Sequence, residues 1–393
     1  MTGGLFDVAV VGAGIHGAGV AQAAAAAGHS VVLIEQYAGP ARGTSSRSSK
    51  LIHGGLRYLE QAQFALVREC LEERALLLRL APELVRLTPF HLPVYAAGDS
   101  VWRLRAGLTL YALLARCGPG ARFSSVPRSR WHDLDGLETR NLRHLFRYFD
   151  AQTDDAALTR AVIASAEALG AEVHYQTALV AAQVDTRRAV LQCESPAGSR
   201  ELAAGVLINA AGPWVAEVIA KVSPPQRPVP LSLVAGSHVL LPGRLTHGAY
   251  TLRARDARVF FALPAGSHVL VGTTELEFRG DPAGVAPTPM ERAYLVDNFR
   301  SAFPGHPAAA SEPLDSFAGL RVLPAQTGPA NRRSRETILR SADGNNGRLL
   351  SIIGGKLTAY RATADKVLRR VGHLLPNRRR RADTRDLPLR PVD

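Results

Sequence analysis

The sequence predicts an α/β protein in which a doubly wound parallel sheet is interleaved with a second, mixed β-sheet domain. Three observations lead to this fold class. An apolar strand at residues 6–11 runs through a glycine-rich turn into an Ala-rich helix, and a second strand follows at once. Residues 227–277 are rich in strand patterns broken by Gly and Pro. A strand at residues 348–353 then enters a turn and helix, so the first pattern returns near the C-terminus.

The length and composition fit a globular protein. A chain of 393 residues can hold two interleaved domains, and 46% hydrophobic with 21% charged residues is ordinary for a soluble protein. No apolar run reaches the roughly 18–20 residues that cross a bilayer. The first residues run directly into a strand, so we expect no signal peptide.

The net charge of +13 is accompanied by no nucleic-acid-binding motif. We therefore interpret it as a solvated basic surface and expect no nucleic-acid partner, although such charge also suits an anionic substrate or membrane leaflet. Cys70, Cys117 and Cys193 are widely spaced and form no CxxC pair. This pattern indicates reduced thiols in the cytoplasm and argues against a metal site or a disulfide framework.

The N-terminal elements follow from the spacing of apolar residues. Phe6–Val11 predicts a strand, the Ala-rich helix is expected to end at Gly28, and Ser30–Ile34 predicts the second strand. A long helix is expected over residues 61–80, before Pro82. Its apolar face, at spacings of three and four, is expected to comprise Phe64, Val67, Leu71, Ala75 and Leu78.

The remaining elements are expected in chain order. They are a helix at 154–170, a strand pair beginning at 173–184, a strand at 206–209, separate strands at VPLSL, HVLLP, RVFFALP and HVLVGTT, a Pro/Gly loop at 280–289, a helix at 289–303, and the strand at 348–353 with its helix. The apolar segment Ala106–Ala115 is interpreted as a buried helix, with contact to a membrane surface as the alternative. The run Arg378–Arg381 is expected to be a disordered tail.

A GxGxxG motif lies between the first strand and the first helix. Gly12 allows the tight turn, Gly14 lets the backbone approach a pyrophosphate, and Gly17 permits close packing of helix on strand. The helix N-terminus offers amide donors to the phosphates. Glu35 ends the second strand, where a carboxylate can accept from ribose hydroxyls. The motif indicates a dinucleotide but does not distinguish FAD from NAD.

The stretch TSSRSSKLIHGGLRYLE at residues 44–60 favours a flavin. Its hydroxyl groups and glycines can wrap a polar cofactor closely, and an Arg-Tyr pair follows at once. A serine-rich loop that caps the next helix would explain one or two serines but not LIHGGLRY. Of only four lysines, Lys50, Lys221, Lys356 and Lys366, two fall in the presumed flavin motifs.

With these motifs, the sequence resembles the FAD-dependent (aerobic-type) glycerol-3-phosphate dehydrogenases of the D-amino-acid-oxidase-like (DAO) flavoprotein superfamily. The matching stretches span residues 6 to about 371, in family order. They are VVGAGIHGAG, TSSRSSKLIHGGLRYLE, INAAGPW, AGSHVLLP, VGTTELEFRGDP, GLRVLP, SRETIL and GGKLTAYR. The second and the last are highly specific, whereas INAAGPW is shared more widely.

The resemblance implies FAD as cofactor and assigns residues to two groups. The implied flavin contacts are Gly12, Gly14, Gly17, Glu35, Thr44, Ser45, Ser46, Ser49, Lys50, Leu51, Ala211, Gly212, Gly355, Lys356, Leu357 and Thr358. The implied substrate and catalytic residues are Arg57, Tyr58, His238, Arg321, Arg335 and Lys356. This set suits a phosphate dianion, which calls for fixed guanidinium groups. His238 would take the hydroxyl proton, with Arg321 stabilising the developing alkoxide.

Several of these residues have other readings. A lone His in an apolar strand, such as His238, is more often structural, and His268 in the second GSHVL segment is interpreted as a hairpin residue. Arg335 is preferred through the SRETIL alignment, which crosses a gap, so Arg340 remains a substitute. Arg332 and Arg333 are expected to be solvated, and His53 to orient its loop.

The order of these segments along the chain leads to a predicted domain division. We expect a Rossmann-like FAD-binding domain from residues 1–81, 151–225 and 342–393, and a mixed β-sheet substrate-binding domain from residues 82–150 and 226–341. The family usually carries a further C-terminal helical domain, which leaves a homodimer and peripheral contact with the inner face of the cytoplasmic membrane as open expectations. His16 and Arg47 stand where the family commonly has smaller or neutral residues.

The function implied is oxidation of sn-glycerol 3-phosphate to dihydroxyacetone phosphate, with electrons passed from reduced FAD to a quinone. One alternative is a flavin oxidase of another hydroxy or amino acid that uses oxygen, against which the several arginines argue. A second alternative is a flavin-binding scaffold with little turnover.

Overall fold

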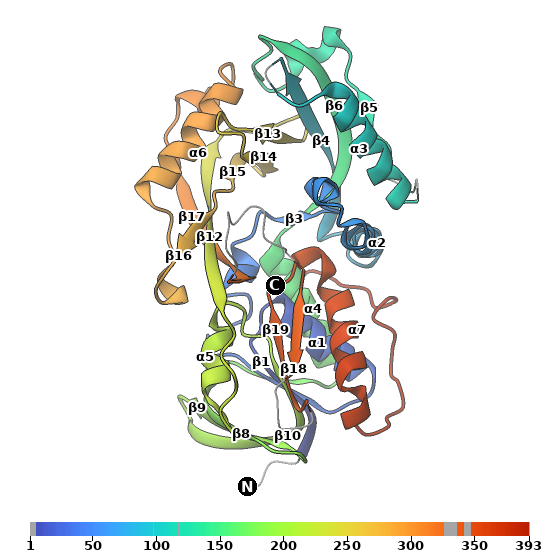
Figure 1. Cartoon of the computed structure of the whole chain (residues 1–393), viewed down its shortest axis with the longest axis vertical. Coiled ribbons are helices and arrows are strands. Elements are labelled where there is room, and N and C mark those ends of the chain that lie inside the picture. The colour runs from blue at the N-terminus through green and yellow to red at the C-terminus, as the bar shows by residue number, and fades with distance from the viewer. Residues whose placement is uncertain are drawn as a thin grey trace.

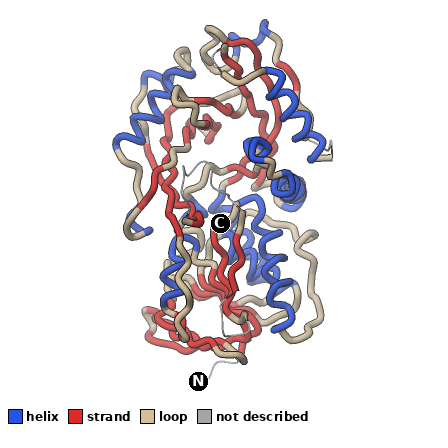
Figure 2. Tube along the Cα trace, viewed as in Figure 1, coloured by secondary structure: helices blue, strands red, loops and turns tan. Residues whose placement is uncertain are grey.

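The computed structural model describes residues 5–96, 98–116, 118, 120–325, 336–341 and 347–392. Two β-sheets, each flanked by helices, lie one above the other along the long axis of the molecule (Figure 1). The strands form two separate groups, and the chain passes between them repeatedly (Figure 2). The predicted fold class, a Rossmann-like domain interleaved with a mixed β-sheet domain, is confirmed.

Sheet A is the lower sheet, and its centre is parallel. The order of the parallel strands is β7–β2–β1–β10–β19. Their bounds are β1 (Leu5–Val11), β2 (Val31–Ile34), β7 (Glu172–His174), β10 (Gly198–Asn209) and β19 (Leu349–Ile353). The first part of β10 instead pairs antiparallel with β9. The remaining strands are β8 (Ala178–Val184), β9 (Ala189–Ser195), β11 (Val222–Ser223) and β18 (Ile338–Ser341).

Helices α1 (Ile15–Ala26), α4 (Asp155–Ala168) and α7 (Tyr360–Val371) share one apolar core with sheet A. Helix α1 is almost wholly buried because its small side chains let both neighbouring helices approach closely. A Cβ at Gly19 would lie 2.7 Å from the Tyr360 ring, for example. Gly28 follows the helix with a φ of 96°, the left-handed conformation predicted for it.

Sheet B is the upper sheet. Its strands run in the order β16–β12–β15–β14–β13–β4–β6–β3, with β17 on the other edge of β12 and β5 on β6. The bounds are β3 (Leu51–Ile52), β4 (Val85–Tyr95), β5 (Ser124–Ser125), β6 (Leu142–Thr153), β12 (Leu231–Pro242), β13 (Ala249–Arg253), β14 (Val259–Ala265), β15 (His268–Gly272), β16 (Leu276–Phe278) and β17 (Asp315–Pro324). Helix α6 (Pro289–Ala302) packs against it through Leu295 and Phe299. The strands expected separately at VPLSL and HVLLP are one continuous strand, β12.

Two expectations about helices are corrected. Helix α3 (Val101–Leu114) is not buried as predicted, because only Leu108 and Tyr111 are covered while Trp102 and Leu113 are 77% and 60% exposed. Helix α2 (Phe64–Leu80) ends before Pro82 as expected; Val67 and Leu71 of its predicted face are buried, but Phe64 and Ala75 are exposed.

Two charged residues, which apolar spacing does not reveal, are also buried on α2. Glu73 pairs with Arg361 of α7, and Arg74 pairs with Asp150 of β6. These partners satisfy the charges within the protein, so the burial of Glu73 and Arg74 is tolerated. Phe64, which we expected on the apolar face, is instead 44% exposed.

The C-terminal segment is not a disordered tail. Arg378 donates two hydrogen bonds of 3.0 Å to the Asp7 carboxylate at the start of sheet A. The Arg381 backbone N–H donates to the Ala26 carbonyl at the end of α1. Leu389 is buried in the core of sheet A, and its N–H donates to the Leu80 carbonyl. Residues 378–389 therefore lie across the helical face of sheet A, and the basic run is part of the fold.

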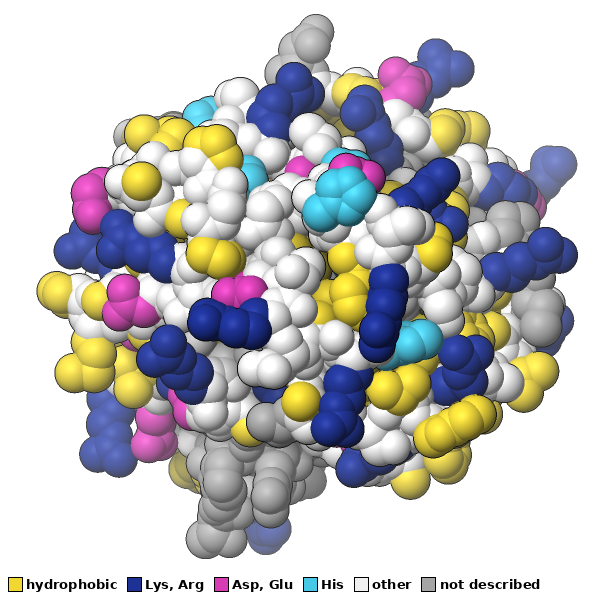
Figure 3. Space-filling view, turned by 90° about the horizontal axis from the view of Figure 1, so that it is seen from above, with side chains coloured by type: hydrophobic (Ala, Val, Ile, Leu, Met, Phe, Trp, Pro, Cys, Tyr) yellow, Lys and Arg dark blue, Asp and Glu magenta, His cyan; other side chains and the backbone are white. Residues whose placement is uncertain are grey.

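The sheets depart slightly from the predicted domain limits. Strand β3 lies in the segment assigned to the FAD-binding domain but belongs to sheet B. Strand β18 lies in the segment assigned to the substrate-binding domain but belongs to sheet A. Lys and Arg side chains are scattered among apolar and acidic ones on the face seen from above (Figure 3). Among the described residues, no helix has both the length and the apolar character that crossing a bilayer requires.

Candidate active site

A pocket of about 750 Å³ lies between the two sheets. Its walls come from the segments after β1, β2, β10 and β19 and from strands β12 and β17. The carboxyl ends of parallel strands are where ligands bind in open α/β sheets. The pocket thus continues from this edge of sheet A to the facing surface of sheet B.

The glycine turn forms one end of the pocket. Gly12 has a φ of 103°, and a Cβ there would lie 2.8 Å from the Ala210 carbonyl oxygen. Gly12 and Gly14 line the pocket, whereas Gly17 does not, because it packs against the Gly12 carbonyl. The absence of side chains at this helix N-terminus leaves the space that a pyrophosphate needs.

Glu35 lines the pocket beside this turn. Its carboxylate accepts hydrogen bonds from the N–H groups of Ala13 (2.7 Å) and Tyr37 (3.0 Å). Burial raises the pKa of Glu35, while these hydrogen bonds act in the opposite direction. The two bonds fix the carboxylate and leave lone pairs that can accept from ribose hydroxyls. The turn and Glu35 together fit the adenosine and pyrophosphate parts of FAD.

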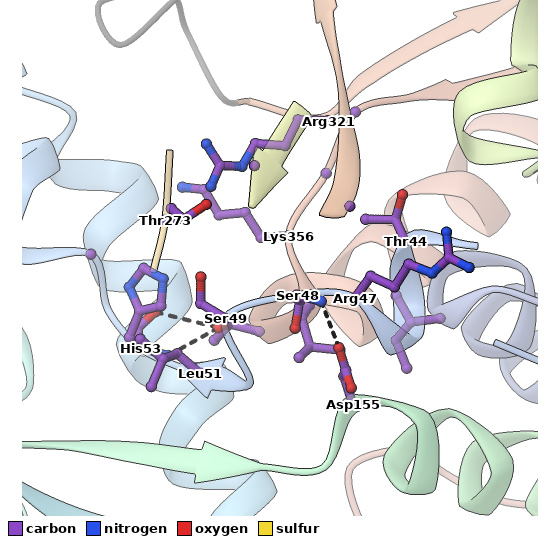
Figure 4. A pocket seen from close by; sticks show the side chains of 18 of the residues that line it. Thr44, Arg47, Ser48, Ser49, Leu51, His53, Asp155, Thr273, Arg321 and Lys356 are labelled. Carbon is purple, nitrogen blue, oxygen red and sulfur yellow. Dashed lines mark hydrogen bonds between the residues drawn. The ribbon is translucent and has the colours of Figure 1, made fainter. Parts of the chain in front are cut away.

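The hydroxyl-rich loop is held by its own hydrogen bonds. Thr44 donates to the Leu320 carbonyl (2.7 Å), and the Ser45 hydroxyl accepts from the N–H of Ile15 (2.9 Å). The Ser48 N–H donates to Asp155 (2.9 Å), as Figure 4 shows, and Lys50 forms an ion pair with the same carboxylate. Asp155 is fully buried at the start of α4, so it fixes the loop to sheet A's helices.

This loop presents only some of the expected flavin contacts to the pocket. Thr44, Ser45, Ser49 and Leu51 line it, together with Ser48, which the sequence analysis did not single out. Lys50 and Ser46 do not line it: Lys50 donates to the Ser46 carbonyl (3.2 Å), and the Ser46 hydroxyl donates to Gly43. A flavin contact from these two residues therefore stays a prediction.

The opposite wall comes from the segments after β10 and β19. Ala211, Gly212, Gly355, Lys356, Leu357 and Thr358 all line the pocket, as does His16. Gly355 has a φ of 111°, and a Cβ there would strike the His16 ring. Burial lowers the pKa of His16 to about 4, so the ring is neutral near pH 7. The Thr358 hydroxyl accepts from the His53 N–H (3.1 Å), which joins this wall to the hydroxyl-rich segment.

Tyr58 and Lys356 meet inside the pocket. The Lys356 Nζ lies 3.8 Å from the centroid of the Tyr58 ring, which is within range of a cation–π interaction. Tyr58 is buried in η2 (Leu56–Gln61), directly after the glycine pair of LIHGGLRY. The ammonium group is therefore held at the boundary between the cofactor wall and the substrate side.

His238 is buried in the pocket on β12. Its Nε2 lies 3.0 Å from the Ser49 hydroxyl, and its ring stacks on Phe317 with centroids 5.0 Å apart. Burial, together with the nearby charges of Arg321 and Lys50, lowers the pKa of His238 to about 3. The imidazole is therefore neutral and can accept a proton.

Arg321 and Arg57 converge on one carboxylate, that of Glu275. Its Oε1 accepts from Arg321 Nη1 at 2.9 Å and lies 3.8 Å from Arg57 Nη2. Figure 4 shows Arg321, Lys356 and Thr273 gathered on one side of the pocket, with Ser49 across from them. Glu275 was not predicted as a site residue, although the VGTTE stretch that contains it was among the matching motifs.

The other candidates lie elsewhere. Arg335, Arg332 and Arg333 fall outside the described residues. Arg340 does not line the pocket and donates to the Arg227 carbonyl (3.1 Å). His268 begins β15 in the β14–β15 hairpin, as predicted.

A buried network supports the segment that carries Arg57. The Asp150 carboxylate accepts from Arg74, from the Tyr111 hydroxyl at 2.8 Å and from the Gly54 N–H at 3.4 Å. Because all three donors come from different elements, the carboxylate fixes the start of the Gly54–Tyr58 turn. Sequence reasoning missed this network, since its members are about 40 to 100 residues apart.

Comparison with known proteins gives a consistent picture. The FAD dependent oxidoreductase family (DAO) matches residues 7–361. A glycerol-3-phosphate dehydrogenase of Pseudomonas aeruginosa is 42% identical over 372 residues, which cover 93% of this chain and 71% of the relative. A D-erythritol 1-phosphate dehydrogenase of Brucella abortus is 35% identical over 379 residues, covering 94% and 74% respectively.

A solved structure is also similar throughout. The glycerol-3-phosphate dehydrogenase from Bacillus halodurans, complexed with FAD, superimposes with a TM-score of 0.77 at 25% identity. The match covers 99% of this chain and 68% of that chain.

Proposed function

The chain belongs to the family of FAD-dependent oxidoreductases, and from this premise we propose that it oxidises sn-glycerol 3-phosphate to dihydroxyacetone phosphate. The observation that carries the proposal is the meeting of Arg57, Arg321 and Lys356 with His238 in one pocket that continues into the cofactor-binding turn. Relatives that share this family are named for phosphorylated polyols.

The charges of the pocket suit a phosphate dianion. Arg57, Arg321 and Lys356 are three cations, and the carboxylate of Glu275 leaves two net positive charges. A phosphate monoester carries close to two negative charges at neutral pH. Guanidinium groups bind such an oxyanion through charge-assisted hydrogen bonds, which give orientation as well as affinity.

Oxidation of the substrate also requires that a proton leave its hydroxyl group. The chemistry that FAD supplies when bound is acceptance of a hydride from the carbinol carbon. The neutral His238 imidazole receives the hydroxyl proton, either directly or from the Ser49 hydroxyl at 3.0 Å. The positive charge of Arg321 helps to lower the pKa of His238. A phosphate dianion bound at Arg321 neutralises this charge, so the pKa of His238 rises and the imidazole becomes a better base.

We propose a quinone as the electron acceptor and a peripheral contact with a membrane as its source. Helix α3 supports the membrane contact: it exposes Trp102 and Leu113, and Arg103 and Arg105 lie on the same helix. Aromatic and cationic side chains on one surface helix suit an anionic lipid interface. Sedimentation with anionic and neutral vesicles tests this contact. A protein that binds neither kind of vesicle would contradict it. A homodimer stays a prediction.

The proposed reaction is tested by anaerobic reduction of the purified holoprotein. We expect sn-glycerol 3-phosphate to bleach the flavin absorbance, and glycerol to leave it unchanged. Erythritol 1-phosphate tests a longer phosphorylated polyol. If it bleaches the flavin faster than sn-glycerol 3-phosphate does, the substrate is a four-carbon polyol phosphate. Bleaching by a hydroxy acid or amino acid with peroxide release would favour an oxidase, and no bleaching by any of these would favour a scaffold.

A further inference from the structure

We propose that Glu275 is a positioning residue for phosphate recognition: its carboxylate holds Arg57 and Arg321 in the arrangement that receives the substrate phosphate. This inference rests on the proposed function and adds a residue to which no role has been assigned. It concerns binding of the phosphate rather than the transfer of hydride or proton.

The geometry centres on one oxygen atom. Glu275 Oε1 lies 2.9 Å from Arg321 Nη1 and 3.8 Å from Arg57 Nη2. The Glu275 side chain is only 12% exposed, while those of the two arginines are 27% and 34% exposed. The carboxylate is thus the inner member of the group, and the guanidinium groups face the open part of the pocket.

Arg321 reaches this carboxylate by crossing a strand. Arg321 is opposite Val234 on one edge of β12, whereas Leu276, which follows Glu275, is opposite Ala235 on the other edge. The crossing occurs over Gly236. A Cβ there would lie 2.6 Å from the Thr273 hydroxyl and 3.4 Å from Arg321 Nη2. Any larger side chain at residue 236 would therefore obstruct the path from Arg321 to Glu275.

The two arginines need such a partner because they carry like charges and come from distant segments. Arg57 belongs to η2 and Arg321 to β17. Without a shared anion, their guanidinium groups repel each other, and each long side chain samples many rotamers. A fixed carboxylate offsets the repulsion between the guanidinium groups and restricts their rotamers before the substrate binds. The two arginines are therefore preorganised for the phosphate.

The loop that carries Glu275 has separate supports. The Thr274 hydroxyl donates to Glu291 of α6 (2.6 Å) and accepts from the Ser237 N–H (2.9 Å). The Ser237 hydroxyl donates to the same Glu291 oxygen (2.9 Å). These bonds hold the backbone on the side away from the pocket. Glu275→Gln therefore changes the charge at the arginines without removing what fixes the loop.

The experiment measures phosphate binding and turnover in the holoprotein. Inorganic phosphate is titrated against the flavin absorbance, and kcat and KM are determined for sn-glycerol 3-phosphate. We expect Glu275→Gln to raise the Kd for phosphate and the KM by about 10-fold, within the range for directly coupled residues, and to change kcat less than about threefold. Glu275→Asp, which restores the charge, should recover part of the affinity.

Two controls make the result specific. Glu277→Gln removes a carboxylate two residues away that is 54% exposed, pairs with Arg279 and does not line the pocket, so it should leave both constants unchanged. In an Arg321→Ala background, Glu275→Gln should have a clearly smaller effect, because only the longer contact with Arg57 at 3.8 Å remains. Equal effects in both backgrounds would show that Glu275 acts elsewhere.

The inference would be overturned if Glu275→Gln bound phosphate as well as or more tightly than the unaltered protein, since the carboxylate would then only compete with the ligand. A holoprotein that bound no phosphate at all would also overturn it. If phosphate binding follows the expected pattern but sn-glycerol 3-phosphate does not bleach the flavin, the proposed function fails while the role of Glu275 stands.

Discussion

The Ser49 hydroxyl lies 3.0 Å from His238 Nε2, and this contact joins the hydroxyl-rich loop to strand β12 of sheet B. Ser49 is held by a loop that is fixed to α4 through Asp155, while His238 is held on β12 against Phe317. The proton acceptor is thus positioned by both halves of the molecule. Small shifts between the sheets would alter the chemistry before they altered the binding of the cofactor.

Replacement of His238 should separate cofactor binding from catalysis. We expect His238→Ala to retain the flavin colour but to slow anaerobic bleaching by about 10²- to 10⁴-fold, the usual contribution of a general base. His268→Ala is the matched control, because His268 lies in the same sheet outside the pocket. Stopped-flow absorbance measures both rates, and an unchanged rate in His238→Ala would remove it from the mechanism.

Loss of the Ser49 hydroxyl should have a smaller effect. Ser49→Ala leaves the imidazole neutral but without its hydrogen-bond partner at Nε2, so the ring is less well oriented. The net value of one hydrogen bond corresponds to a slowing of about 2- to 10-fold. The same stopped-flow assay measures it, and a slowing as large as that of His238→Ala would indicate that Ser49 is an obligatory proton relay.

The glycine turn should not tolerate a methyl group. We expect Gly12→Ala to lower the molar ratio of FAD to protein strongly, because residue 12 has a φ of 103° and its Cβ would meet the Ala210 carbonyl oxygen at 2.8 Å. Gly39→Ala, which has no atom within 4 Å of the added Cβ, should keep its FAD. Absorbance after gel filtration gives the ratio, and equal ratios in the two variants would contradict the cofactor position.

The pH dependence of kcat/KM should follow the second ionisation of the substrate phosphate rather than the protonation of His238. The pKa of His238 is lowered to about 3, so the imidazole remains unprotonated from pH 8 down to pH 5. The phosphate group loses its second charge below about pH 6, where kcat/KM should begin to fall. With a phosphonate analogue, the inflection should move by the difference between the second pKa of the phosphonate and that of the phosphate. An inflection that stays in place would point to a group of the protein.

Buried neutral histidines should make the fold sensitive to acid. Burial lowers the pKa of His91 to about 4, whereas the unfolded chain binds this proton near pH 6.5. The unfolded state therefore binds more protons between these values, and stability falls as the pH falls from 6.5 towards 4. His91 alone should account for about 2 kcal/mol of unfolding free energy lost between pH 7 and pH 5.

Urea unfolding at the two pH values measures this loss. His91→Gln should show a smaller decrease than the unaltered protein, while His132→Gln, at an exposed residue, should not. Equal pH dependence in all three proteins would contradict the prediction.

The parts of the fold that depend on neighbours in sequence were predictable. The strand, turn and helix from Leu5 to Ala26 follow from local spacing and from glycines that nothing else can replace. Strands β4 and β6 were not predicted, because they pair with each other across about 50 residues and β4 contains Pro89 and Pro93. The strands at VPLSL and HVLLP were expected to be separate, although Gly236 between them lies inside β12, where the absence of a side chain leaves room for Arg321.

The site was predictable only in part, and for a physical reason. His238 and Arg321 were identified through family motifs, since neither residue type is unusual in a strand. Glu275 carried no such signal, because a single acidic residue at a strand end is common on protein surfaces. Its partners, Arg57 and Arg321, are brought to it only by the tertiary structure. The exposure of α3 was missed because apolar content does not reveal whether a helix has neighbours on every side.

The contact of Arg378 with Asp7 has a consequence for biosynthesis. The turn at Gly12 leaves the ribosome well before the wall at Thr358 and the covering segment up to Leu389. The cofactor cradle is therefore complete only after the segment around Thr358 has been synthesised, and a nascent chain that ends before about residue 360 presents an incomplete cradle.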